Sequence, residues 1–269
     1  MDNAEQPVKR RRGRPRKWVP VIPVTDKPSS VPAPFGTSKR DANGNEVIPL
    51  VKQVYDELLK GLDEGRYRPG ERIKATDLAT ALNLSRAPVR EALHVLAGQG
   101  MVEMRPDKGA VMRELSIHDL IEIYEVVVGP ACVGVIGAAQ NIDLEDNRAR
   151  VEAARDDVLA LLDIPPSVVM YDRLIAFHHV INDIAQKPHA THLFRALNLD
   201  YWHRFLVAII DLEQYMPRYV DNYRRLADAI LAGDVLSAEA IMKSHGQWSC
   251  ERLREGWDRQ FGSLFSAPT

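Results

Sequence analysis

The chain has 269 residues, 45% of them hydrophobic and 27% charged, which is typical of a soluble globular protein with one large or two modest domains. No uninterrupted apolar run reaches the roughly 18 residues that span a bilayer. No apolar stretch follows the basic N-terminus, which argues against a secretory signal. The two cysteines, Cys132 and Cys250, indicate no disulfide framework. We therefore expect a cytoplasmic protein without a membrane segment.

The net charge of −2 hides a strong asymmetry along the chain. Residues 1–45 hold ten basic and four acidic residues, residues 46–114 hold equal numbers, and the remainder holds fourteen basic against twenty-two acidic residues. A basic head on an acidic body indicates a polyanionic partner at one end only. The alternative is a tail that only improves solubility.

Residues 1–45 have the composition of a disordered arm, because they contain seven prolines and few apolar residues. Within the arm, residues 10–17 resemble an AT-hook with the core Arg12, Gly13, Arg14 and Pro15. Such a core can lie extended in a narrow A·T minor groove, where the negative potential attracts arginine. The alternative is a tail that binds by charge alone.

Residues 46–114 predict a winged helix-turn-helix. Leucine or valine at every fourth position from Leu50 indicates a first helix, which ends before the Pro69-Gly70 turn. A second helix starts near Thr76, and a third runs from Ser85 to about 98. Alternating residues at 101–104 and 110–112, with a turn between them, indicate a small β-hairpin, the wing.

The third helix carries the residue types that a DNA recognition helix needs. Arg86 and Arg90 lie four residues apart and therefore share a face, from which they can contact guanine or phosphate. Ser85 and the helix N-terminus can hold a phosphate. At the wing tip, Arg105 and Lys108 supply cations and Gly109 permits a close approach of the backbone. The alternative is that these are ordinary surface residues.

These elements resemble the GntR family of regulators over residues 48–114. The matching segments, in order, are Arg68-Pro69-Gly70-Glu71-Arg72-Ile73, Leu78-Ala79, Leu84 to Leu93, Gly100-Met101-Val102 and Pro106-x-x-Gly109. The resemblance implies DNA contacts from Arg86, Arg90 and Lys108-Gly109, another from Thr76, and a homodimer on a palindromic operator of double-stranded DNA. Ala87 departs from the family, which usually has Thr there.

Residues 115–262 predict an all-α helical bundle, followed by a tail at 263–269. Helices are expected at about 117–139, 143–162, 167–186, 189–212, 216–232 and 235–260. Phe177-His178, Gly233-Asp234-x-x-x-Ala238 and His245 resemble the ligand-binding domain of the FadR subfamily. Two features depart from that subfamily. Val127 replaces a usual Arg, and Gly129-Pro130 is expected to interrupt the first helix.

Many FadR-type domains hold a divalent metal with one Asp or Asn and three His, and that pattern is incomplete here. Leu174 and Tyr223 stand at two of the four positions, which leaves His178 and His245. Two imidazoles and a neutral phenol make a poor metal site, so we expect no metal or other cofactor. Weak binding with help from Asn182 stays open.

We instead expect His178, Tyr223, His245 and Asn182 to bind a small-molecule effector, such as an organic acid. The alternative is that the histidines are packed in the core. Overall, the sequence predicts a transcription regulator that is mainly α and is controlled by an effector. An enzyme is disfavoured, because no H-E-x-x-H, G-x-S-x-G or phosphate-loop motif is present. An architectural DNA-binding protein without an effector is the second reading, and it would need no internal cavity.

Overall fold

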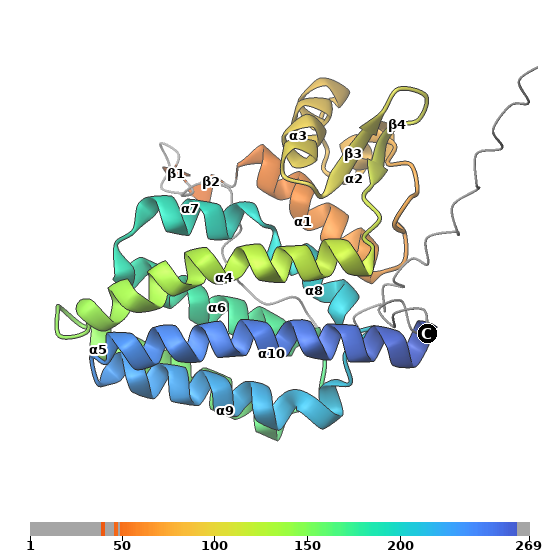
Figure 1. Ribbon diagram of the computed structural model, residues 1–269. Coiled ribbons are helices and arrows are strands. Elements are labelled where there is room, and N and C mark those ends of the chain that lie inside the picture. Colours follow the sequence, from red (N-terminus) through yellow and green to blue (C-terminus); the bar gives the residue numbers. More distant parts are fainter. Residues whose placement is uncertain (1–38, 41–45, 48, 263–269) are drawn as a thin grey trace, which may run out of the picture.

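The computed structural model describes residues 39–40, 46–47 and 49–262. A small part with a hairpin lies at one end, over a larger bundle of long helices (Figure 1). The sequence therefore predicts the fold class correctly. The AT-hook-like core, Arg12 to Pro15, lies outside the described residues.

The small part has the winged helix-turn-helix order. Its elements are α1 (Leu50–Asp63), α2 (Ala75–Ala81), α3 (Arg86–Gly98), β3 (Val102–Arg105) and β4 (Gly109–Met112). The four-residue spacing in α1 buries one face of that helix against α3. Strands β3 and β4 pair antiparallel, and Arg105 lies opposite Gly109. Gly109 has a φ of +71°, which glycine adopts without steric cost.

The larger part is a bundle in which α4 lies between α10 and α6, while α5 packs against α6 and α9. The elements are α4 (Ile117–Gln140), α5 (Asn147–Leu159), the 3₁₀ turn η1 (Ala160–Asp163), α6 (Val168–Ala185), α7 (Pro188–Ala196), α8 (Leu199–Leu206), α9 (Leu212–Leu231) and α10 (Val235–Phe261). The predicted capping box at the start of α4 is present, between Ser116 and Asp119. Buried apolar residues form one cluster that continues from the winged helix into the bundle.

The helix boundaries correct the sequence reading at three points. Helix α4 continues through Pro130, and α9 begins at Leu212, earlier than the expected start near 216, so that Pro217 lies inside it. Packing against neighbouring helices outweighs the hydrogen bond that each proline removes. The single helix expected at 189–212 is broken at Asn198, which has a φ of +50° and separates α7 from α8. Asparagine tolerates this conformation better than most residues do.

Order also begins earlier than expected, since β1 (Lys39–Arg40) pairs with β2 (Glu46–Val47). Helix α4 differs from expectation in another way. By length and composition it meets the criteria for a membrane-spanning helix, which the core helix of a bundle can also meet. Of its most apolar stretch, 44% is buried in the chain. Its contacts with α10 and α6 are those of a core helix in a bundle.

The serines at the N-caps of α4 and α3 provide a test of the capping bond. We expect Ser116→Ala to lower the free energy of unfolding by about 1 kcal/mol, because the Ser116 side chain accepts a hydrogen bond from the Asp119 backbone. Ser85→Ala is the matched control, since the Ser85 side chain makes no capping bond at the start of α3. Urea unfolding of both variants measures the difference. Equal losses would contradict the assignment.

Candidate DNA interface and effector cavity

The N-terminus of α3 gathers the predicted recognition residues on one exposed face. Arg86 and Arg90 are exposed, and neither forms an ion pair with any residue that the structure describes. Ser85 is the N-cap residue, is exposed, and leaves its hydroxyl group without a capping bond. The first N–H groups of a helix have no partner within the helix. Two cations, a hydroxyl and these N–H groups together suit a phosphate and a base edge.

The wing lies at the same end of the molecule as α3, away from α9 and α10 (Figure 1). Lys108 is exposed, and a Cβ at Gly109 would meet no atom within 4 Å. Arg105 is engaged, because its Nη2 lies 2.9 Å from the Glu103 carboxylate. Thr76 is exposed near the start of α2 and donates to Asp77 at 3.1 Å. Lys108 and Thr76 are therefore accessible to DNA, whereas Arg105 would have to leave Glu103.

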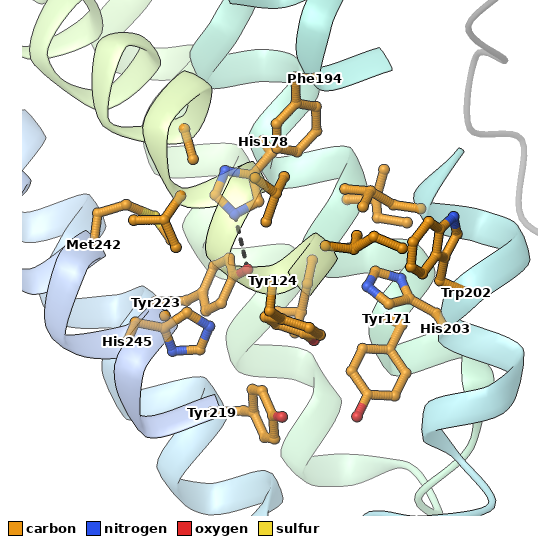
Figure 2. Close-up of a pocket in the computed structure, with 18 of the residues that line it drawn as sticks. Tyr124, Tyr171, His178, Phe194, Trp202, His203, Tyr219, Tyr223, Met242 and His245 are labelled. Atoms are coloured by element: carbon orange, nitrogen blue, oxygen red, sulfur yellow. Dashed lines mark hydrogen bonds between the residues drawn. The ribbon is translucent and has the colours of Figure 1, made fainter. Parts of the chain in front are cut away.

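The helical bundle contains a cavity of about 50 Å³, shown in Figure 2. Six helices, α4, α6, α7, α8, α9 and α10, supply its walls. Its lining comprises Leu120, Ile123, Tyr124, Val127, Val128, Ala131, Tyr171, Leu174, Ile175, His178, Phe194, Leu199, Trp202, His203, Tyr219, Tyr223, Met242, His245 and Gly246. An internal cavity is thus present, and this is the feature that an effector-responsive regulator needs and a purely architectural protein does not.

Three predicted effector residues meet on one side of this cavity. The Nε2 atom of His178 lies 2.9 Å from the hydroxyl of Tyr223, drawn as the dashed line in Figure 2. The rings of Tyr223 and His245 are 5.1 Å apart. Asn222 donates from its amide nitrogen to Nδ1 of His245 at 3.1 Å. Because that Nδ1 accepts, the neutral His245 ring carries its proton on Nε2.

Burial keeps the cavity histidines uncharged. Desolvation lowers the pKa of His178 to about 3 and that of His203 to about 3. The same cause lowers the pKa of His245 to about 4. Burial also raises the pKa of Tyr219 to about 12. All four groups are therefore neutral at pH 7.

Several residues of the opposite wall were not predicted from the sequence. His203 lines the cavity and stacks on Tyr171 with ring centroids 4.5 Å apart. Its Nδ1 has no hydrogen-bond partner among the described residues. Tyr219 lies four residues before Tyr223, so its position on the same helix face was detectable from spacing. Trp202 gave no such signal, because its helix was assigned as part of a longer one.

Asn182 does not belong to this site. It lies one turn after His178, but its side chain is buried against Gly134 of α4 and is not part of the cavity wall. The missing Cβ at Gly134 leaves the space that the Asn182 side chain occupies. The expectation that Asn182 contacts an effector is corrected by this placement.

The residues at the family's metal position do not fit a divalent ion. Leu174 offers no ligand atom, and Tyr223 occupies the neighbouring position as a phenol bonded to His178. Among the described residues, no group of three or more His, Cys, Asp or Glu is placed to hold a metal. Zinc sites normally need at least three protein ligands.

Two family models match the chain: "Bacterial regulatory proteins, gntR family" over residues 50–112 and "FCD domain" over residues 126–247. The HTH-type transcriptional regulator YdhC of Bacillus subtilis is 23% identical over 77% of this chain and 92% of its own length. A protein of Paenarthrobacter nicotinovorans named "Probable D-xylose utilization operon transcriptional repressor" is 24% identical over 73% of this chain and 85% of its own.

Solved structures share the fold. Escherichia coli McbR/YncC has a TM-score of 0.63 at 20% identity, covering 78% of this chain and all of that one. A GntR regulator from Rhodococcus sp. RHA1 has a TM-score of 0.58 at 23% identity, covering 76% and 96%. Regulators of this kind bind DNA operators and small-molecule effectors. The chain belongs to the GntR family of transcription regulators, with the FadR-like combination of a winged helix-turn-helix and an FCD effector domain.

Proposed function

We propose that the chain is a cytoplasmic, homodimeric regulator that binds a palindromic operator. Its affinity for the operator changes when an effector fills the cavity. It performs no catalysis in this proposal. The observation that carries the proposal is the position of α8. One face of this helix forms the cavity wall, and the other is bonded to the winged helix-turn-helix.

The inner face of α8 contributes Leu199, Trp202 and His203 to the cavity. Figure 2 shows Trp202 and His203 across the cavity from His178 and His245. An occupant that contacts the trio of His178, Tyr223 and His245 and fills the cavity would therefore also contact α8 on the opposite wall.

The outer face of α8 is anchored to α1 by a buried ion pair. The guanidinium of Arg204 donates to both carboxylate oxygens of Asp63, at 2.6 and 2.9 Å. Only 4% of the Arg204 side chain and 13% of the Asp63 side chain are exposed. A third guanidinium nitrogen donates to the Asp200 carbonyl at 2.6 Å, which fixes the arginine to its own helix. A two-pronged bond of this kind fixes direction as well as distance.

Two further bonds join the ends of the winged helix to α8. Asn198, just before α8, donates from its amide to the carbonyl of Gln99, which follows α3, at 2.7 Å. Tyr201 donates to the carbonyl of Arg113, directly after the wing strand β4. The recognition helix and the wing are thus both attached to the same short helix.

The size of the cavity suggests why binding would move α8. An apolar cavity of about 150 Å³ holds benzene, so a ring-sized occupant needs more than the 50 Å³ present. One wall must give way, and displacement of α8 would carry Arg204 and Asn198 with it. An effector acts only through a difference in affinity between two such arrangements.

The outer face of α4 supports the proposed homodimer. Val126 and Val133 are 53% and 42% exposed, and a Cβ at Gly129 between them would meet nothing within 4 Å. These positions lie at i, i+3 and i+7 and so form one apolar stripe. A second copy packed on this stripe would cover it and create the two-fold symmetry that matches a palindrome.

Arg90→Ala tests the DNA interface. We expect loss of specific operator binding with the dimer intact, because each half-site loses a groove-facing cation worth about 1–3 kcal/mol. A gel-shift titration at fixed salt measures this, and light scattering checks the dimer. Arg105→Ala is the comparison, and its loss should be smaller because Arg105 is already paired with Glu103. Unchanged operator affinity of Arg90→Ala would show that Arg90 does not contact the operator.

A cavity-filling variant tests the coupling without an identified effector. Met242→Trp adds bulk to the cavity wall and should change operator affinity at least about fivefold, a typical allosteric coupling. In an Asp63→Asn/Arg204→Met background the change should be smaller, because the buried ion pair between α8 and α1 is gone while the Asn198–Gln99 and Tyr201–Arg113 bonds remain. Removing both partners avoids leaving one charge buried alone.

The control for this cycle is Leu236→Trp, on the same helix but 79% exposed. It should leave operator affinity unchanged. Urea unfolding checks that each variant is folded. An equal effect of Met242→Trp in both backgrounds would show that Arg204 and Asp63 do not transmit it.

The dimer proposal is tested by charge on the α4 stripe. Val126→Glu/Val133→Glu should yield a monomer at micromolar concentration and weaken operator binding, since two carboxylates per copy would be forced into the interface. Light scattering gives the mass, and Leu144→Glu, an equally exposed site outside α4, is the control. A dimer that persists in the double variant would place the interface elsewhere.

A further inference from the structure

We propose that the cavity binds an uncharged aromatic compound that carries a hydrogen-bonding group, rather than a carboxylate or a metal-bound carboxylate. This inference rests on the proposed function and names the ligand class of the same site. It replaces the organic acid expected from the sequence with a ligand that carries no negative charge.

Among the described residues that line the cavity, none is Lys, Arg, Asp or Glu. Two guanidinium groups that act electrostatically on the cavity histidines are not part of the lining: Arg204, which acts on His203, is bonded to Asp63, and Arg218, which acts on His245, lies 3.9 Å from Asp221. A buried carboxylate needs a paired cation, and this cavity offers none.

The histidines do not replace that cation readily. Burial lowers the pKa of His245 to about 4, so this ring is neutral at pH 7 and offers an anion an N–H donor but no positive charge. His178 starts still lower, with a pKa of about 3.

The walls favour a flat ring. Phe194 and Tyr223 lie at one side, and Tyr171 and Trp202 lie at the other (Figure 2). Tyr219 lies between the two sides at the base of the view. Aromatic rings attract one another in edge-to-face and offset arrangements, so a ligand ring gains contacts here that an aliphatic chain would not.

Two ring nitrogens on opposite walls supply polar anchors. The Nδ1 atom of His203 has no hydrogen-bond partner among the described residues, and the residue is only 7% exposed. A buried polar atom of this kind costs free energy until a ligand satisfies it. The Nε2–H of His245 is the second anchor, because Asn222 occupies the other nitrogen. An amide or a hydroxyl on the ring would satisfy either anchor without a charge.

The matched pair benzamide and benzoate separates charge from shape. We expect benzamide to raise the unfolding temperature of the full chain at pH 7.5 and to alter tryptophan fluorescence, through Trp202 in the wall. Benzoate should bind at least about tenfold more weakly. Equal or tighter binding of benzoate overturns the proposal, and so does failure of both compounds to bind.

Two variants sharpen the result. Leu174→Arg should reverse the preference toward benzoate, because arginine keeps its charge when buried. His203→Phe retains a ring but removes Nδ1, so it should weaken benzamide about fivefold and leave toluene unchanged. If Leu174→Arg does not fold, the His203 comparison decides alone. An equal loss for benzamide and toluene would overturn the anchor.

The metal arm uses elemental analysis of untagged protein purified without chelator. Wild type should hold less than a tenth of an equivalent of zinc, nickel or manganese, whereas Leu174→Asp/Tyr223→His should bind one equivalent. A full equivalent in wild type, lost in His178→Ala/His245→Ala, overturns the proposal.

None of these binding measurements contains DNA. Benzamide that binds but leaves operator affinity unchanged would therefore contradict the proposed function and leave the ligand class standing.

Discussion

The buried ion pair between Arg204 and Asp63 is the interaction on which the proposed response to a ligand depends. It joins α8 to α1, and α8 also forms one wall of the cavity. A buried pair of this type adds little net stability, since desolvation offsets much of the attraction, but it strongly disfavours any arrangement in which one partner is left alone. The winged helix therefore either moves together with α8, with the ion pair intact, or separates from it with the ion pair broken. This favours two discrete arrangements over gradual deformation.

The same low-polarity surroundings govern the chemistry of the cavity. Burial holds His178, His203 and His245 neutral, and Leu174 removes the acidic group that a divalent ion would need. With Tyr223 bonded to His178, the site is built from aromatic rings and neutral hydrogen-bonding groups. The selectivity for uncharged ligands that we propose would follow from the lack of a charged side chain among the described residues that line the cavity, without any need for a steric filter.

The sequence predicted the winged helix closely because its signals are local. The leucine spacing of α1, the glycine at 109 and the arginines of α3 each follow from backbone geometry or helix periodicity. The trio of His178, Tyr223 and His245 came from a family pattern and was brought together as expected. The break at Asn198, the role of His203 and the displacement of Asn182 depend on contacts between distant segments, which no local pattern contains. The prolines of α4 and α9 misled for the same reason.

Thermodynamic linkage gives the most direct test of the connection between cavity and DNA. If benzamide changes operator affinity by a given factor, operator DNA must change benzamide affinity by the same factor. Titration calorimetry of benzamide into the free protein and into the protein–operator complex measures that factor independently of any variant. We predict two different dissociation constants whose ratio equals the shift in operator affinity. Identical constants in the two titrations would contradict it.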